Sequence, residues 1–77
     1  MTLAISAQLD LTGLSCPLPI IKTAKAMKGL ASGDLVEVLA TDPGSVKDFA
    51  AWARTTGNEL LESSQFGNVF RFVIRKR

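Results

Sequence analysis

The sequence has few of the residues on which most catalytic and metal-binding sites depend. Its 77 residues include one cysteine, no histidine and no tyrosine. A disulfide framework needs paired cysteines and a structural zinc site needs four Cys or His ligands, so neither can form within one chain. The missing imidazole also excludes Ser-His-Asp and Cys-His catalysis. We therefore predict no metal and no cofactor, and any thiol chemistry must use Cys16 without a histidine.

Targeting features and long apolar runs are absent as well. The segment from Met1 to Ser6 lacks the basic start and the continuous apolar run of a signal peptide. No apolar run approaches the roughly 20 residues of a membrane span. One free thiol without an export signal is typical of a cytoplasmic protein. The length of 77 residues and the hydrophobic share of 47% predict one domain, residues 1–77, with a thin core.

The net charge of +2 comes from the C-terminal end of the chain. Residues 1–70 contain five Lys and Arg residues against all seven Asp and Glu residues, which leaves this part at −2. The four cations that follow are Arg71, Arg75, Lys76 and Arg77. A patch of four is a weak indication of nucleic-acid binding, so the pattern favours a solvated end of the chain. Direct RNA binding through these residues is the weakest of three functional hypotheses, and the other two are given below.

Hydrophobic periodicity predicts four strands. Apolar and polar residues alternate over 5–11, which is typical of a strand with one buried face. A nearly continuous apolar run over 35–40 suits a central strand. Two more strands are predicted over 58–63 and 69–76, and the tight-turn pair Gly67–Asn68 between them predicts a hairpin.

Two amphipathic helices are predicted between the strands. The first runs from Pro17 to about Lys28, and the second begins at Ser45, with Asp48 in a capping-box position, and stops at Gly57. Each helix has one apolar stripe at helical spacing. The stripe residues are Ile20, Ala24, Met27 and Ala31 in the first helix and Val46, Phe49, Ala50 and Ala53 in the second, with Trp52 at the flank as a packing residue.

The element order predicts the fold class. The first strand–helix–strand unit should be a right-handed crossover between parallel strands, and the hairpin adds an antiparallel pair. The order βαβαββ therefore predicts a two-layer α/β sandwich, with two helices on one face of a mixed four-stranded sheet. The opposite sheet face should be partly polar. Its expected polar residues are Glu37, Glu59, Glu62, Arg71 and Arg75.

The thiol lies where parallel strand–helix units collect reactive groups. The loops after the first two strands should meet at one sheet edge, and Cys16 is in the first of them. With Cys16 as N-cap and Pro17 as first helical residue, the helix dipole should lower the pKa of the thiol. Pro19 also lacks an N–H, which leaves the amides of Leu18 and Ile20 facing the sulfur. We expect Pro19 to limit the lowering of the pKa.

The segment Leu9 to Pro19 closely resembles the TusA family of sulfur carriers, also called SirA-like, whose hallmark is Cys-Pro-x-Pro after Leu-Asp-x-x-Gly-Leu-x. The similarity covers all but about the first eight residues. Its further matching positions are Lys22, Gly33-Asp34, residues 35–41, Asp42-Pro43, Gly57 to Leu60 and the last strand to Lys76. The resemblance implies a four-stranded sheet with two helices, in agreement with the periodicity.

The resemblance also implies a function. Cys16 would accept a sulfane sulfur as a persulfide and pass it to another protein, as a sulfurtransferase component and not a stand-alone turnover enzyme. The implied donors are a cysteine desulfurase or a rhodanese-like protein, and the implied acceptor is DsrE-like or TusD-like. Family pathways include tRNA thiolation, sulfur oxidation, and molybdenum cofactor or selenium metabolism. Leucine at position 18, between the prolines, weakens an assignment to tRNA thiolation and favours an apolar partner cleft.

Other roles stay open at this point. Asp10 and Asp42 match family positions, and each has two readings: a backbone hydrogen bond in a turn, or a contact with a partner. Lys22 either lies on a solvated helix face or supplies a positive charge that favours an anionic sulfur at Cys16. The alternative to sulfur carriage is a regulatory or scaffold module that binds partners through the same fold without moving sulfur.

Overall fold

The structure is a computed structural model that describes residues 4–77. Part of the segment considered for a signal peptide, residues 1–3, lies outside the described residues. The elements are β1 (Ile5–Leu11), α1 (Leu18–Met27), β2 (Leu35–Ala40), α2 (Ser45–Thr56), β3 (Glu59–Phe66) and β4 (Val69–Arg75). The predicted order βαβαββ is confirmed. None of the helices described is long and apolar enough to cross a bilayer.

One mixed sheet carries the fold. Its strand order is β1-β2-β4-β3, with β1 and β2 parallel and the other two pairs antiparallel. The turn between β3 and β4 is Gly67–Asn68, and Gly67 has a φ of 61°, a left-handed conformation that glycine adopts without steric cost. β3 is longer than predicted, because residues 64–66 continue the pairing with β4 up to the turn.

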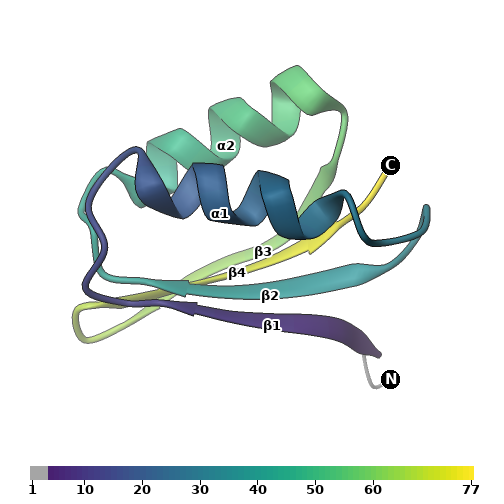
Figure 1. Ribbon diagram of the computed structural model, residues 1–77. Coiled ribbons are helices and arrows are strands. Elements are labelled where there is room, and N and C mark those ends of the chain that lie inside the picture. Colours follow the sequence, from purple (N-terminus) through teal and green to yellow (C-terminus); the bar gives the residue numbers. More distant parts are fainter. Residues whose placement is uncertain (1–3) are drawn as a thin grey trace.

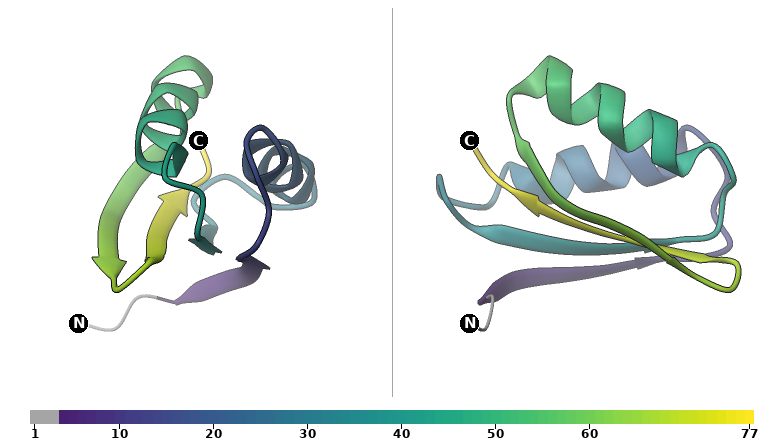
Figure 2. Two further views of the ribbon diagram at one scale, coloured as in Figure 1. Left: turned by 90° about the vertical axis from the view of Figure 1, so that its left-hand side faces the viewer. Right: turned by 180° about the vertical axis from the view of Figure 1, so that it is seen from behind.

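Both helices cover the same face of this sheet, as Figures 1 and 2 show. The predicted two-layer α/β sandwich is thus confirmed. The core lies between the layers, where Phe49 of α2 stacks on Phe72 of β4 with ring centroids 4.6 Å apart. Side chains from the central strand β2 are fully buried beneath them, among them Val36 and Val38. Full burial of one such side chain stabilises the fold by roughly 1.5–3 kcal/mol.

The face that α2 presents to the sheet differs from the prediction by one position. Val46 was expected in the core, but it is 42% exposed, whereas Ser45, Phe49 and Ala53 are buried. The capping-box prediction is wrong too, because the N-cap is Gly44 and no side chain caps the helix. The pattern of apolar residues could not show that the helix buries its first residue, because that residue, Ser45, is polar.

α1 shows the same kind of displacement. The helix begins at Leu18, one residue later than predicted, and its buried positions are Pro19, Thr23 and Met27. Ile20 and Ala24 pack only partly, and Ala31, the last residue of the predicted stripe, is exposed beyond the end of the helix. Pro19 and Thr23, each one position before a predicted stripe residue, are buried in place of Ile20 and Ala24, whereas Met27 is buried as predicted.

The outer face of the sheet is partly polar, as predicted, and its arginines are paired. The Nε of Arg71 lies 2.6 Å from a carboxylate oxygen of Glu37, and the same guanidinium also pairs with Glu62. Arg75 pairs with Glu59. The ammonium group of Lys76 donates a hydrogen bond to the Leu30 carbonyl. These contacts occupy three of the four C-terminal cations and weaken the case for an RNA-binding surface.

The register of α2 predicts a large loss of stability for a substitution at Phe49 and almost none for a substitution at Val46. Phe49→Ala should destabilise the protein by about 3–5 kcal/mol, because it empties the centre of the core, and Phe49→Leu by about 1.5 kcal/mol or less. Val46→Ala should change the free energy of unfolding by no more than about 0.5 kcal/mol, because the side chain is on the surface. Urea unfolding measures all three. Equal losses for Val46→Ala and Phe49→Ala would contradict the register.

Candidate functional site

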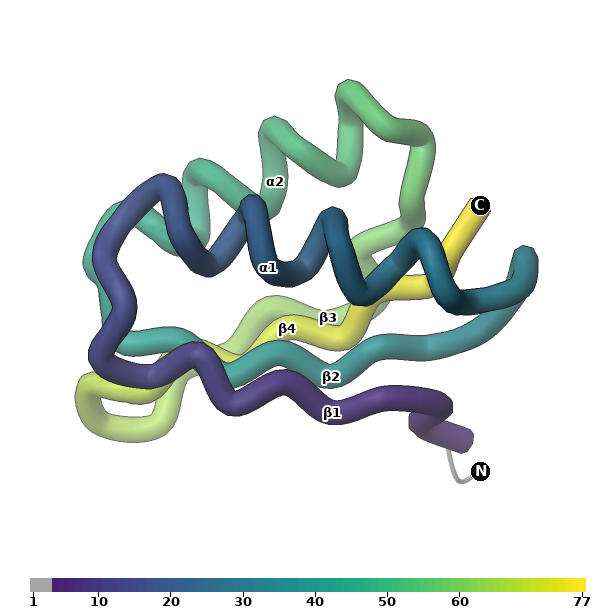
Figure 3. The backbone as a smooth tube through the Cα atoms, in the orientation of Figure 1, coloured from purple at the N-terminus to yellow at the C-terminus, as the bar shows by residue number. Residues whose placement is uncertain are grey.

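The parallel pairing of β1 and β2 brings two loops together at one end of the sheet. Leu11, the last residue of β1, pairs with Ala40, the last residue of β2. The loops that follow are joined by a hydrogen bond of 2.8 Å from the Gly13 amide to the Thr41 hydroxyl. Figure 3 shows both loops at the end of the molecule opposite the two termini. The prediction that the two loops share one edge is confirmed.

Cys16 lies in the first of these loops, and its thiol is free and exposed. The prediction that Cys16 is the N-cap of α1 is wrong, because Pro17 occupies that position with φ −98° and ψ 14°. The peptide bond between Cys16 and Pro17 is cis. Immediately before the helix, the chain makes a turn in which the Leu18 amide donates to the Ser15 carbonyl at 2.9 Å.

This later start of the helix leaves few amide donors for the sulfur. The prediction that the Leu18 N–H faces the thiol is wrong, because that group is bonded to Ser15. The Ile21 amide donates to the Pro17 carbonyl at 3.1 Å, and Pro19 has no N–H. Of the amides in the first turn, only that of Ile20 remains. Pro19 is buried and Pro17 exposed, so the first anchors the helix to the core while the second lies beside the thiol at the surface.

A carboxylate governs the protonation of Cys16. The carboxylate of Asp48, in the first turn of α2, favours the protonated thiol and raises the pKa of Cys16, and partial desolvation and the charges of Asp48 and Asp42 raise it further. The predicted lowering of the pKa is therefore wrong, and with it the premise that Pro19 limits such a lowering. A negative charge beside the sulfur disfavours the thiolate, and the first turn of α1 has few free amides to offset it.

Two aspartates thus belong to the neighbourhood of the thiol. Asp42 caps the turn before α2, since its Oδ2 accepts from the Gly44 amide at 3.1 Å and its carbonyl from the Ser45 amide at 3.0 Å. A Cβ added to Gly44 would stand 3.1 Å from the Asp42 Oδ2 and 3.7 Å from that of Asp48. Glycine at this position therefore leaves space for both carboxylates. Asp48 was predicted only as a cap, although its place in the first turn at this edge could have indicated more.

The two remaining candidate residues, Asp10 and Lys22, are not among the groups that shift the pKa of Cys16. Asp10 accepts hydrogen bonds from the Thr12 hydroxyl at 2.7 Å and from the Thr12 amide at 3.1 Å, and these bonds lower the pKa of Asp10. This is the turn role considered above. Lys22 is exposed on α1.

Apolar side chains are exposed on the first turns of both helices. Leu18 and Ile21 on α1 are 43% and 55% exposed, and Val46 on α2 is 42% exposed. Both helix N-termini lie at the edge that carries Cys16 (Figure 1). The surface next to the thiol therefore combines apolar area with two carboxylates, a composition suited to contact with another protein.

The fold and the site together define a small α/β protein that presents a single exposed thiol at one edge of its sheet. Residues 7–76 match the family described as sulfurtransferase TusA. The chain is 54% identical to the sulfur carrier protein TusA of Allochromatium vinosum, over 90% of this chain and 91% of that one. It is 36% identical to the sulfur carrier protein TusA of Pseudomonas aeruginosa, over 100% and 98% of the two chains.

A solved structure agrees with these sequence relatives. The crystal structure of the SirA-like protein from Desulfitobacterium hafniense matches with a TM-score of 0.79 and 27% identity, over 90% of this chain and 95% of that one. The chain belongs to the TusA family.

The contact between Asp48 and the thiol predicts how Cys16 titrates. In the wild-type protein, the rate of alkylation by iodoacetamide should rise with pH to a midpoint above that of an ordinary thiol, because Asp48 stabilises the protonated form. Asp48→Asn removes the charge and should lower the midpoint, so that alkylation near neutral pH becomes faster. Glu59→Gln, which removes a carboxylate on the outer face of the sheet, serves as the control. A midpoint that is the same in Asp48→Asn and wild type would contradict the assignment.

Proposed function

We propose that this protein is a sulfur carrier that accepts sulfane sulfur on Cys16 and delivers it to another protein. The supporting observation is that the one cysteine of the chain is exposed at the edge where both helices begin, within a TusA-family sequence. A carrier of this kind interacts with sulfur donors and sulfur acceptors. A lone thiol suits the task, because the chain holds no second cysteine that could convert the persulfide into an intramolecular disulfide.

The chemistry is a thiolate exchange that needs no imidazole. The Cys16 thiolate attacks the outer sulfur of a donor persulfide, a new S–S bond forms, and the donor cysteine leaves as a thiolate. Cys16 then carries the sulfur as Cys–S–SH. In the second half, an acceptor thiolate attacks this outer sulfur and Cys16 leaves as a thiolate. Neither step changes the total number of electrons, and the proton balance is completed by water.

The raised pKa of Cys16 fits a carrier better than it fits an enzyme nucleophile. Near neutral pH the resting group is the thiol, which resists oxidation, since the thiolate is the reactive form. The thiolate that does form is a strong nucleophile, because intrinsic nucleophilicity increases with thiol pKa. It is also a poor leaving group, so the Cys16 persulfide releases its sulfur slowly to incidental thiols. Asp48 thereby helps the protein to retain its cargo until an acceptor is bound.

The surface around Cys16 defines the kind of partner. Its exposed apolar residues and the acidic pair Asp42 and Asp48 would contact a partner whose reactive cysteine lies in an apolar surface with a nearby cation. A cysteine desulfurase or a rhodanese-like protein is the proposed donor, and a DsrE-like protein the proposed acceptor. Pro17 and Pro19 fix the start of α1 and with it the position of the thiol. The cytoplasm, where thiols stay reduced, is the proposed location.

Sulfur loading tests this function. Incubation with a cysteine desulfurase and cysteine, or with a persulfidated rhodanese, should add one sulfur atom to the intact mass of the wild-type protein and none to Cys16→Ser. Reduction should restore the original mass, because the added sulfur is bound as a persulfide. A wild-type protein that stays unmodified with several donors, or a Cys16→Ser protein modified to the same extent, would refute sulfur carriage on Cys16. Partner binding and a cellular phenotype that survive Cys16→Ser would favour the scaffold alternative.

A further inference from the structure

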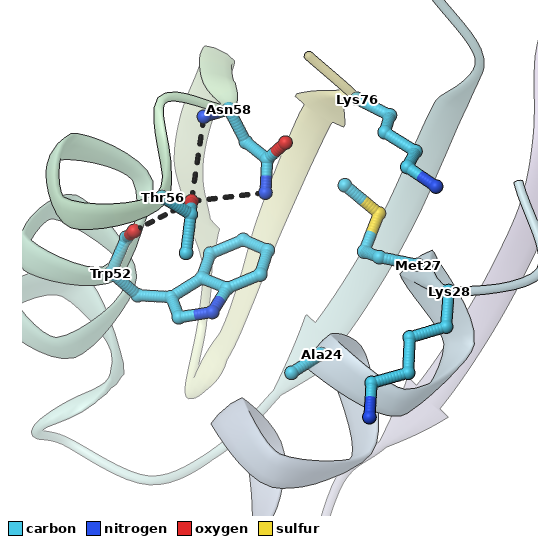
Figure 4. A pocket seen from close by; sticks show the side chains of 7 residues that line it. All are labelled: Ala24, Met27, Lys28, Trp52, Thr56, Asn58 and Lys76. Atoms are coloured by element: carbon cyan, nitrogen blue, oxygen red, sulfur yellow. Dashed lines mark hydrogen bonds between the residues drawn. The ribbon is translucent and has the colours of Figure 1, made fainter. Parts of the chain in front are cut away.

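A pocket lies between the two helices at the end of the molecule opposite Cys16. Its volume is about 170 Å³, and it is bordered by the last turns of α1 and α2 (Figure 4). The lining residues Ala24 to Lys28 follow Leu18 by six to ten residues, and a helix rises about 1.5 Å per residue, so they lie roughly 9–15 Å along α1 from the helix end that follows Cys16. The pocket is therefore separate from the sulfur site, and its role does not depend on the function proposed above.

Three of the seven residues that line the pocket are apolar, and Thr56 and Asn58 add polar groups at the end of α2. Ala24 and Met27 come from α1 and Trp52 from α2, and Figure 4 shows the indole ring and the Met27 side chain on opposite sides of the opening. The Trp52 ring is held in place by an edge-to-face contact with Phe49, with centroids 6.0 Å apart. An apolar cavity of about 150 Å³ accommodates a benzene molecule. The pocket thus has room for one ring or a branched alkyl group.

The charged groups around the pocket are both cationic. Lys28 and Lys76 line it, and no acidic residue does. The hydrogen bond from Lys76 to the Leu30 carbonyl fixes one ammonium group at this end of the sandwich. The Trp52 indole N–H donates to no other group within residues 4–77, which leaves one more donor at the wall.

Hydrogen bonds satisfy part of the carbonyl groups at the helix ends nearby. The carbonyls of Lys25, Ala26 and Met27 at the end of α1 accept hydrogen bonds from the amides that follow them. On α2, the Trp52 carbonyl accepts from the Thr56 hydroxyl at 2.8 Å and the Ala53 carbonyl from the Gly57 amide at 2.9 Å. These hydrogen bonds offset part of the negative end of each helix dipole, and Lys28 and Lys76 supply the two full positive charges among the lining residues.

We propose that this pocket binds a small carboxylate whose apolar body is the size of one ring or a branched alkyl group. The apolar body lies between Trp52 and Met27, and the carboxylate faces Lys28 and Lys76. A neutral alcohol of the same size gains the apolar contact only, and an amine is repelled by the two cations. A unit charge about 4 Å from an opposite charge in water strengthens binding about fivefold, which sets the expected preference.

Trp52 is the one tryptophan in the chain, so its fluorescence reports directly on the pocket. Titration of the full chain at constant ionic strength compares benzoate, benzyl alcohol and benzylamine. Benzoate should give a saturable change with an affinity at least about fivefold higher than that of benzyl alcohol, and benzylamine should bind more weakly than either. The absence of a saturable change with benzoate, equal affinities for the three compounds, or tighter binding of benzylamine would overturn the proposal.

Variants of the lining residues locate the binding. Lys28→Gln should weaken benzoate binding about fivefold and leave benzyl alcohol binding unchanged. Lys47→Gln, which removes an exposed lysine of α2 outside the pocket, is the matched control and should leave both unchanged. Ala24→Met should fill the pocket and abolish binding, with thermal unfolding as the check on its fold. Benzoate binding as tight in Lys28→Gln as in Lys47→Gln would overturn the proposal. Cys16→Ser should bind benzoate like wild type, which keeps this test separate from sulfur carriage.

Discussion

The site depends on the parallel pairing of β1 with β2. Because the last residues of the two strands, Leu11 and Ala40, lie side by side, both chain segments leave the sheet at the same edge. Both helices then return over the same face, with their N-termini next to each other (Figure 1). This arrangement places the first turn of α2 within reach of the loop that precedes α1. The contact between Asp48 and Cys16 is a consequence of the topology.

Two electrostatic effects compete at the thiol, and the carboxylate prevails. A helix N-terminus stabilises a thiolate through its free amides, but in α1 one of these amides is replaced by proline and another is bonded to Ser15. The carboxylate of Asp48 acts on the thiol side chain itself and is the largest influence that raises its pKa. The resulting Cys16 is protonated at rest, strongly nucleophilic when ionised and slow to leave. These properties serve a protein that must accept sulfur, hold it and release it at a chosen contact.

Much of the fold could be predicted from the sequence, because its strands and its hairpin follow local rules. Alternation in β1, the apolar run of β2 and the Gly67–Asn68 turn each specify their own structure. The helix registers could not be predicted in the same way. Ser45 and Thr23 are polar yet buried, so a search for apolar stripes assigned their places to neighbours such as Val46.

The candidate site shows the same limit. Cys16 and its two prolines stand in a recognisable motif, and the turn roles of Asp10 and Asp42 follow from their own neighbours in the chain. The pKa of Cys16 depends instead on Asp48, which is distant in the sequence and meets the thiol only after the sheet has formed. A local rule, the helix dipole, therefore predicted the wrong direction. A motif does not show which residues from other parts of the chain will lie beside it, here Asp48 in the first turn of α2.

The central claim is that the Cys16 thiolate is the group that takes up sulfur. The most direct test is the pH dependence of single-turnover sulfur transfer from a persulfidated rhodanese to this protein, followed by rapid quenching and mass spectrometry. The account predicts that the transfer rate rises with pH along the same titration curve as the alkylation of Cys16, and that prior alkylation of Cys16 abolishes transfer. Transfer that ignores this titration, or that continues when Cys16 is blocked, would contradict it.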